Sequence, residues 1–170
     1  MWYQEGMTRV NMAVGSAHQN PDGTNVVSAS GLLNDGSDTV RVIAADMTLD
    51  RISVIVNSFI EMHDAEAFLV DKDSSVILAS RDSDLISKTL GADGQSAFYK
   101  DVEKKVSGKS YDFCTLDGNM TVFKEVNGTN WLLVSYVPTN VVLADLVGLR
   151  NLMIIFSIIS ILVSVSYTHL

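Results

Sequence analysis

The sequence has little cysteine, little proline and no excess of positive charge. Its single cysteine, Cys114, excludes an intrachain disulfide framework and any site built on paired cysteines. Only 2 of 170 residues are proline and 47% are hydrophobic, which excludes intrinsic disorder. The formal net charge of -8 argues against nucleic acid as a partner, since phosphate binding needs clustered lysine and arginine. What remains is an acidic globular protein of one domain or two small modules.

Catalytic and metal-binding patterns are also missing. The three histidines are His18, His63 and His169, and none has metal-ligand spacing with a carboxylate. The sequence has no Gly-x-Ser-x-Gly nucleophile elbow and no phosphate-binding glycine loop. We therefore expect no catalytic residue, no cofactor and no metal in this chain.

Charge is absent from one end of the chain. Every Asp, Glu, Lys and Arg lies at or before Arg150, and an almost unbroken apolar run follows. A spanning helix needs about 20 apolar residues, whereas a core helix normally carries a polar face. We interpret 139–164 as an exit helix and a transmembrane segment cut short, with a buried helix as the alternative. Residues 165–170 resemble a translated sequencing adapter and are interpreted as a scar.

The first third of the chain predicts a hairpin followed by a helix. Two β-branched and apolar runs, 25–33 and 39–46, are joined by Asn-Asp-Gly-Ser-Asp, so we expect them to pair as neighbours. Thr48 can cap the helix that follows. The apolar stripe of this helix consists of Leu49, Ile52, Val56, Phe59 and His63.

Residues 64–138 predict a second unit. Two strands, 65–70 and 75–80, precede a short helix near 83–90 and a longer helix over 95–106. Three further strands cover 110–117, 120–126 and 130–138. This order predicts an α+β fold with a PAS-like antiparallel sheet and helices against one face.

The last strand should lead directly into the exit helix. Pro138 ends the strand, and Thr139 can cap a helix that runs unbroken into the apolar tail. A short heptad-like seam follows, formed by Val142, Leu146, Leu149 and Met153. The seam fits two interpretations equally, which are a homodimer contact and packing of the helix on its own sheet.

In this order the segments resemble the double Cache sensor domains of bacterial chemoreceptors (methyl-accepting chemotaxis proteins) and related membrane sensors. Trp2-Tyr3 resembles the end of the family's first long helix. Residues 25–53 are similar to its strand-turn-strand, which ends in a Gly-x-Asp-Ile-like element with Asp46 at the Asp position. Residues 67–87 and 117–138 resemble the opening hairpin and the closing strands of its membrane-proximal module.

The resemblance implies a two-module sensor at the cell membrane. Residues 1–63 would be the C-terminal part of the membrane-distal module and 64–138 the complete membrane-proximal module, with the preceding transmembrane helix outside this fragment. Residues 1–150 would be extracytoplasmic, bind a small molecule and pass a conformational signal through the membrane helix. The alternative is the sensor of a membrane-bound diguanylate cyclase or histidine kinase whose catalytic part is missing.

Trp2 and Asp46 are the ligand-binding residues that the resemblance implies. A carboxylate at a strand end can hold a ligand ammonium, and an indole can add a cation–π contact. Helix capping is the alternative for Asp46, and core packing is the alternative for Trp2. Amino-acid-binding members carry a Tyr and an Asp where this chain has residues 17–20. Gln19 and Asn20 would offer neutral hydrogen bonds there, which favours an amine or small polar ligand over a free amino acid.

Overall fold

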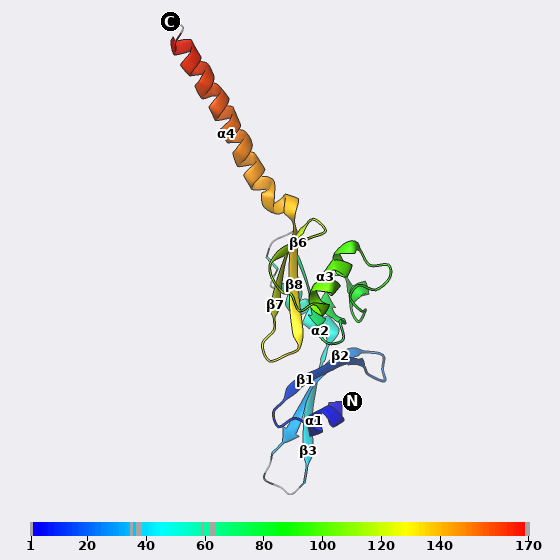
Figure 1. Ribbon diagram of the computed structural model, residues 1–170. Helices are drawn as coiled ribbons and strands as arrows, with labels where there is room; N and C mark the ends of the chain where they lie inside the picture. Colours follow the sequence, from blue (N-terminus) through cyan, green and yellow to red (C-terminus); the bar gives the residue numbers. More distant parts are fainter. Residues whose placement is uncertain (1, 35, 37–38, 59, 62–63, 169–170) are drawn as a thin grey trace.

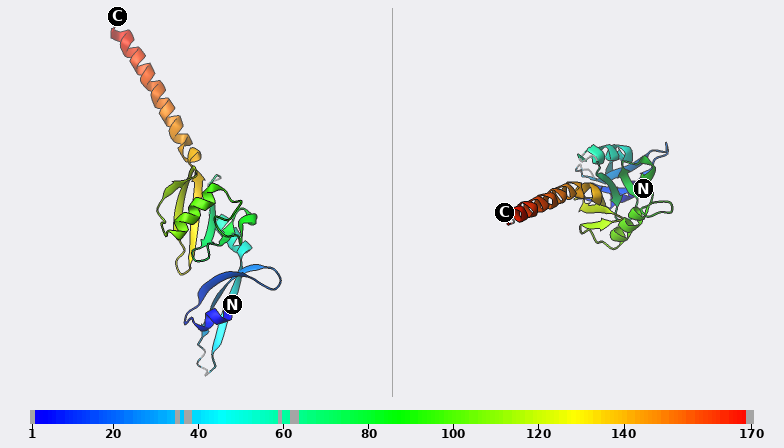
Figure 2. Two further views of the ribbon diagram at one scale, coloured as in Figure 1. Left: turned by 45° about the vertical axis from the view of Figure 1, so that its right-hand side comes forward. Right: turned by 90° about the horizontal axis from the view of Figure 1, so that it is seen from above.

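Three structural parts follow one another along the molecule, which are a small sheet, a larger sheet and a long helix (Figure 1). The computed structural model describes residues 2–34, 36, 39–58, 60–61 and 64–168. Both sheets are antiparallel and both carry helices, which confirms the predicted α+β fold. The left view of Figure 2 shows that the long helix leaves the larger sheet at the end away from the small sheet.

The first sheet has three strands in the order β1-β2-β3. These strands are β1 (Ala13–Gln19), β2 (Asn25–Leu33) and β3 (Arg41–Thr48). Strands β2 and β3 pair continuously from Val26 opposite Thr48 to Leu33 opposite Arg41. The predicted hairpin is therefore confirmed, and its register places Ser28 directly opposite Asp46.

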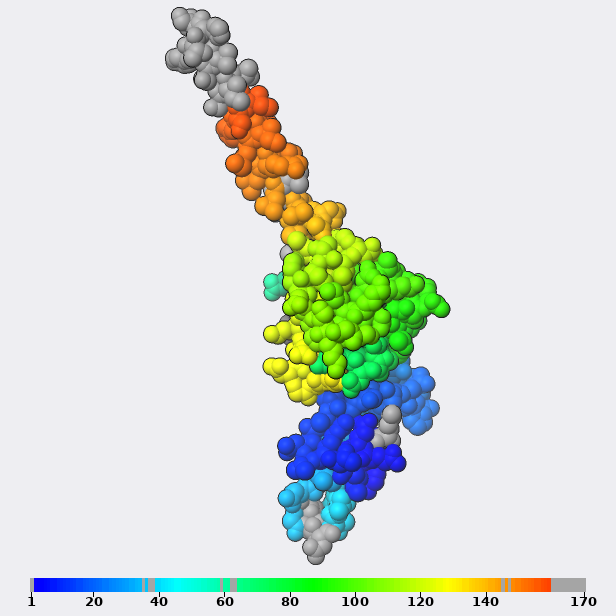
Figure 3. Space-filling view, in the orientation of Figure 1, coloured from blue at the N-terminus to red at the C-terminus, as the bar shows by residue number. Residues whose placement is uncertain are grey.

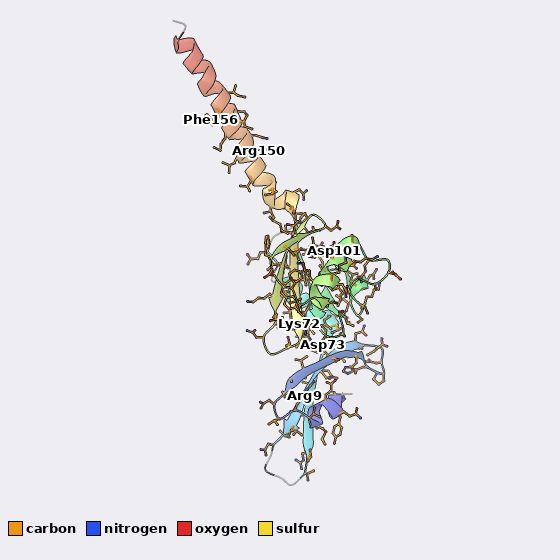
Figure 4. The ribbon with its side chains drawn as sticks, viewed as in Figure 1. Arg9, Lys72, Asp73, Asp101, Arg150 and Phe156 are labelled. Atoms are coloured by element: carbon orange, nitrogen blue, oxygen red, sulfur yellow. The ribbon has the colours of Figure 1, made fainter. Side chains whose placement is uncertain are left out.

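Helix α1 (Trp2–Met7) packs on one face of the first sheet, which we call the α1 face. A Cβ on Gly6 of this helix would collide with Val42 and would lie 3.3 Å from the Cβ of Ser30. The helix is held at its end by Arg9, labelled in Figure 4. The Arg9 guanidinium donates to the Ala13 carbonyl at 2.9 Å and lies 3.4 Å from the Glu5 carboxylate.

A first prediction concerns packing at Gly31 of β2. Because Gly31 has no side chain, the segment before β1 can lie directly against the β2 backbone. A Cβ at Gly31 would lie 2.8 Å from the backbone nitrogen of Met12, and backbone atoms cannot move aside cheaply. We expect Gly31→Ala to lower the free energy of unfolding by about 1–3 kcal/mol in urea denaturation. In the matched control, Gly15→Ala, the new methyl would meet the flexible end of Glu5, and the loss should be smaller. Equal losses in the two variants would contradict this packing.

Helix α2 (Leu49–Ser58) joins the two sheets. The Arg51 amide donates to the Thr48 hydroxyl at 3.3 Å, which confirms the predicted cap. Leu49 and Ile52 are buried in one apolar cluster with Val27 of the first sheet and with Leu69, Leu78 and Ala79 of the larger sheet. Phe59 and His63 of the predicted stripe lie outside the described residues.

The second sheet has five strands in the order β5-β4-β8-β7-β6. They are β4 (Glu66–Asp71), β5 (Ile77–Ser80), β6 (Cys114–Leu116), β7 (Asn119–Glu125) and β8 (Trp131–Pro138). The last strand along the chain, β8, lies between β4 and β7 in the middle of the sheet. This arrangement confirms the predicted PAS-like antiparallel sheet.

Helices cover both faces of the second sheet. Helix α3 (Ala97–Ser107) buries Phe98, Val102 and Val106 against one face, where Phe68 and Val134 form the core. This part of the prediction is confirmed. The other face is covered only in part by α2, because its ten residues shield β5 and β4 and leave the middle of the sheet open.

The predicted helix near 83–90 is wrong beyond its first turn. Only Ser83–Leu85 form a helix, which is a single 3-10 turn. Asp82 caps its start, because the Asp82 carboxylate accepts a hydrogen bond from the Asp84 amide at 2.9 Å. The chain then turns at Ser87 (φ 67°) and pairs with the edge of the sheet. The Ile77 amide donates to the Lys88 carbonyl at 2.9 Å. Edge pairing satisfies backbone groups that a continued helix would have satisfied internally.

Helix α4 (Thr139–Thr168) continues from β8, as predicted, without a break. The Thr139 amide donates to the Gly118 carbonyl at 2.9 Å, while its buried hydroxyl has no partner among the described residues. The expected Thr139 side-chain cap is therefore not formed. Instead, the β6–β7 turn holds the first backbone amide of the helix. The status of residues 165–170 as a scar stays a prediction.

The described part of α4 stands clear of both sheets as a slender column (Figure 3). The seam residues Leu146, Leu149 and Met153 are 59%, 57% and 68% exposed, so packing of the seam on its own sheet is wrong. Phe156, labelled in Figure 4, is 64% exposed. The segment Thr139–Ile159 is long and apolar enough to cross a membrane.

Candidate functional site

A polar pair lies on the α1 face of the first sheet, where β2 and β3 run side by side. The Ser28 hydroxyl donates to Oδ1 of Asp46 at 2.6 Å. Ser28 is only 1% exposed, whereas Asp46 is exposed. Among the described residues, no other group hydrogen-bonds the Asp46 carboxylate. The face therefore presents one anchored carboxylate with an open oxygen.

A second hydroxyl lies two residues along the same strand. Ser30 is 0% exposed, and its Oγ has no partner within the described part of the chain. It lies below Gly6 of α1, on the same face as Ser28 because side chains alternate along a strand. An unpaired buried hydroxyl costs about 1–3 kcal/mol. The α1 face thus has a buried hydroxyl without a hydrogen-bond partner among the described residues, directly beneath α1.

Trp2 lies at the start of α1 and is 39% exposed, so the alternative of core packing is wrong. Its indole meets the Tyr3 ring edge-on, with centroids 5.8 Å apart. Trp2 and Asp46 belong to elements that pack on each other, but no hydrogen bond joins them among the described residues. The helix-cap alternative for Asp46 is also wrong, because Asp46 bonds Ser28 while Thr48 caps α2.

The expectation for Gln19 needs a correction. Gln19 pairs with Asn25, which is three residues from Ser28 along β2. Because side chains alternate along a strand, Gln19 lies on the face opposite Ser28 and Asp46. Its amide donates instead to the Gly23 carbonyl at 3.0 Å and stabilises the turn between β1 and β2. Asn20 lies in the same turn, where its backbone bonds Thr24 and Gly23. Neither side chain is placed beside the Ser28–Asp46 pair.

The second sheet carries an apolar groove that sequence reasoning missed. It has a volume of about 370 Å³ and lies between α2 and the open part of β4 and β8. Its lining includes Ile52, Val56, Leu69, Trp131, Leu133 and Ser135. Among the described residues of the lining, Ser135 is the single hydroxyl side chain and none is charged. The sequence signal for this groove was the apolar stripe of α2. Part of this stripe, including Ile52 and Val56, lines the groove.

A hydrogen-bonded tyrosine lies at the end of the second sheet nearest α4. The Tyr136 hydroxyl donates to the Glu66 carboxylate at 2.5 Å, and its ring packs at a tilt against Phe98 with centroids 4.4 Å apart. Burial raises the pKa of Tyr136 far above its usual value, and the bond to Glu66 raises it further. The tyrosine therefore stays a neutral donor that ties α3, β4 and β8 together, two residues before the sheet ends at Pro138.

Across the described ranges, no group of three His, Cys, Asp or Glu side chains is placed to hold a metal ion. The only cysteine, Cys114, is half-buried on the short edge strand β6.

Several solved structures align with this chain over most of its length. The ligand-binding domain of the amino-acid chemoreceptor PctC of Pseudomonas aeruginosa PAO1, in complex with GABA, aligns with a TM-score of 0.55 and 21% identity over 81% of this chain and 60% of that chain. The ligand-binding domain of Mlp24 with asparagine gives 0.60 and 18%, over 85% and 57%. The extracellular domain of the histidine kinase mmHK1S-Z3 gives 0.65 and 17%, over 87% and 56%.

The chain therefore spans less than two thirds of the length of these structures. No protein-family model and no curated protein matches the sequence. The aligned proteins are ligand-binding and extracellular sensor domains rather than catalytic domains. At identities of 17–21% the comparison shows the fold alone. This chain has the Cache-like fold that its sequence resembled.

Proposed function

We propose that this chain is the C-terminal part of the extracytoplasmic ligand-sensing domain of a transmembrane chemoreceptor. The observation that carries the proposal is that the chain has both features a sensor needs. The first sheet presents the exposed carboxylate of Asp46, held by Ser28, and the continuous helix α4 leaves the second sheet. In this proposal, residues 1–63 are the C-terminal part of the membrane-distal, ligand-binding module, 64–138 the membrane-proximal PAS-like module, and 139–164 the exit helix with the membrane segment. The α4 seam would then serve a homodimer contact where the helix approaches the membrane.

The ligand class follows from the charge on the α1 face. Asp46 offers a carboxylate with one oxygen open, and Ser30 offers a buried hydroxyl. A carboxylate binds an ammonium through charge-assisted hydrogen bonds, which are the stronger kind. Trp2, partly exposed on the adjacent helix, would add a cation–π contact. The site therefore favours a small ligand with a primary amine over a simple anion.

A thermal-shift screen tests this proposal. The chain in nanodiscs is heated with GABA, asparagine, simple alkylamines and matched organic acids that lack the amine. We expect amine-containing compounds to raise the midpoint of unfolding, because a ligand that binds only the folded state stabilises it by about 2.7 kcal/mol at a hundredfold excess over Kd. Shifts from the amine-free acids alone would contradict an ammonium site.

A membrane-bound enzyme is the second candidate for the protein that carries this sensor, because extracellular domains of histidine kinases share the fold. In that case the sensor would control a histidine kinase or a diguanylate cyclase. The residues that follow the membrane helix in the complete gene decide between the outputs. Long heptads support the chemoreceptor, whereas a phospho-accepting histidine or a Gly-Gly-Asp-Glu-Phe-like motif supports the enzyme.

A further inference from the structure

Asp46 is held by a single bond from a side chain that the sequence did not single out. Ser28 lies opposite Asp46 in the β2–β3 ladder, and its hydroxyl donates to Oδ1 at 2.6 Å. Ser28 is only 1% exposed, so its own position is fixed by the sheet around it. The exposed carboxylate therefore takes its orientation from a buried donor.

A serine hydroxyl has one proton to donate, and Ser28 gives it to Oδ1. This leaves Oδ2 of Asp46 as an acceptor without a partner among the described residues. An exposed carboxylate without such a bond would sample several rotamers, and a ligand would have to order it on binding. Ordering one such side chain costs about 0.5–1.5 kcal/mol, which is about two- to tenfold in affinity.

We propose that Ser28 is a positioning residue for ligand binding, which fixes Asp46 so that Oδ2 faces the ligand ammonium. The inference rests on the proposed function and adds to it the group that pre-organises the site. Ser28 itself does not touch the ligand, because its only donated hydrogen is engaged and the residue is buried.

Three variants test the proposal with GABA and butylamine as probes. Ser28→Ala removes the donor and should weaken amine binding about two- to tenfold in calorimetric titration. Ser28→Thr keeps a hydroxyl and should bind more tightly than Ser28→Ala, whereas Asp46→Asn should weaken binding more than either. If Ser28→Ala and Ser28→Thr bind like wild type while Asp46→Asn does not, the positioning role is contradicted and the proposed site stands. If Asp46→Asn binds like wild type, the proposed site itself is contradicted.

A readout without ligand separates positioning from a structural role. The side-chain couplings of Asp46, measured by NMR on the unliganded chain, should report one rotamer in the wild type and in Ser28→Thr. In Ser28→Ala they should report rotamer averaging, while the urea midpoint stays close to that of Ser28→Thr. A single unchanged rotamer in Ser28→Ala would overturn the proposal, whatever ligand is used.

Discussion

Replacing Asp46 by asparagine is expected to weaken amine binding about 10- to 150-fold, since a hydrogen bond to a charged group contributes about 1.5–3 kcal/mol. Asparagine keeps an acceptor oxygen for the Ser28 hydroxyl, so the variant removes the charge and preserves the bond. Its unfolding midpoint without ligand should therefore match that of the wild type. Calorimetric titration with butylamine and a thermal melt measure the two quantities on the same sample.

Asp46→Ala serves as the informative control. It also loses the ligand, but it leaves the buried Ser28 hydroxyl without an acceptor, at a cost of about 1–3 kcal/mol. We therefore expect lower stability for the alanine variant than for the asparagine variant. Amine binding that survives both substitutions would exclude Asp46 from the site.

A proline in α4 is expected to abolish signalling without changing ligand affinity. The helix runs unbroken from Thr139 to Thr168, directly from the central strand β8. Val147→Pro removes one backbone hydrogen bond and clashes with the preceding turn, at about 3 kcal/mol, and so kinks or breaks the helix. Shifts of packed elements pass between discrete states, and a broken helix no longer carries such a shift.

The measurement compares output and binding in the full-length receptor. Ligand-dependent output should disappear in Val147→Pro, while the Kd for the amine stays at the wild-type value. Val147→Ala is the matched control and should signal normally, because alanine is the best helix former. Normal signalling by the proline variant would show that α4 is not the route of the signal.

Local patterns in the sequence predicted most of the fold. The β-branched and apolar runs 25–33 and 39–46 and the turn residues between them predicted that the two strands pair as neighbours, because both signals are local. The helix near 83–90 failed for the opposite reason. Its backbone bonds to Ser75 and Ile77 depend on the edge of a sheet formed elsewhere in the chain, which no local pattern reveals.

The candidate site was only half visible in the sequence. Asp46 could be singled out by resemblance, but its donor Ser28 lies 18 residues away and reads as an ordinary strand serine. The apolar groove was hidden for a similar reason, since it arises where α2 is too short to cover β4 and β8. The Ser28–Asp46 bond and the groove both depend on which strands and helices lie side by side, and this is set by the tertiary structure.

The two tryptophans allow the most direct test of the ligand site. Trp2 lies on α1 beside the first sheet, and Trp131 lines the apolar groove of the second. Their indole N–H resonances, assigned with Trp2→Phe and Trp131→Phe, are followed by NMR while butylamine is added. Binding beside α1 predicts that the Trp2 signal moves saturably and the Trp131 signal stays. Movement of the Trp131 signal alone would place the ligand in the groove and contradict a ligand site on the α1 face.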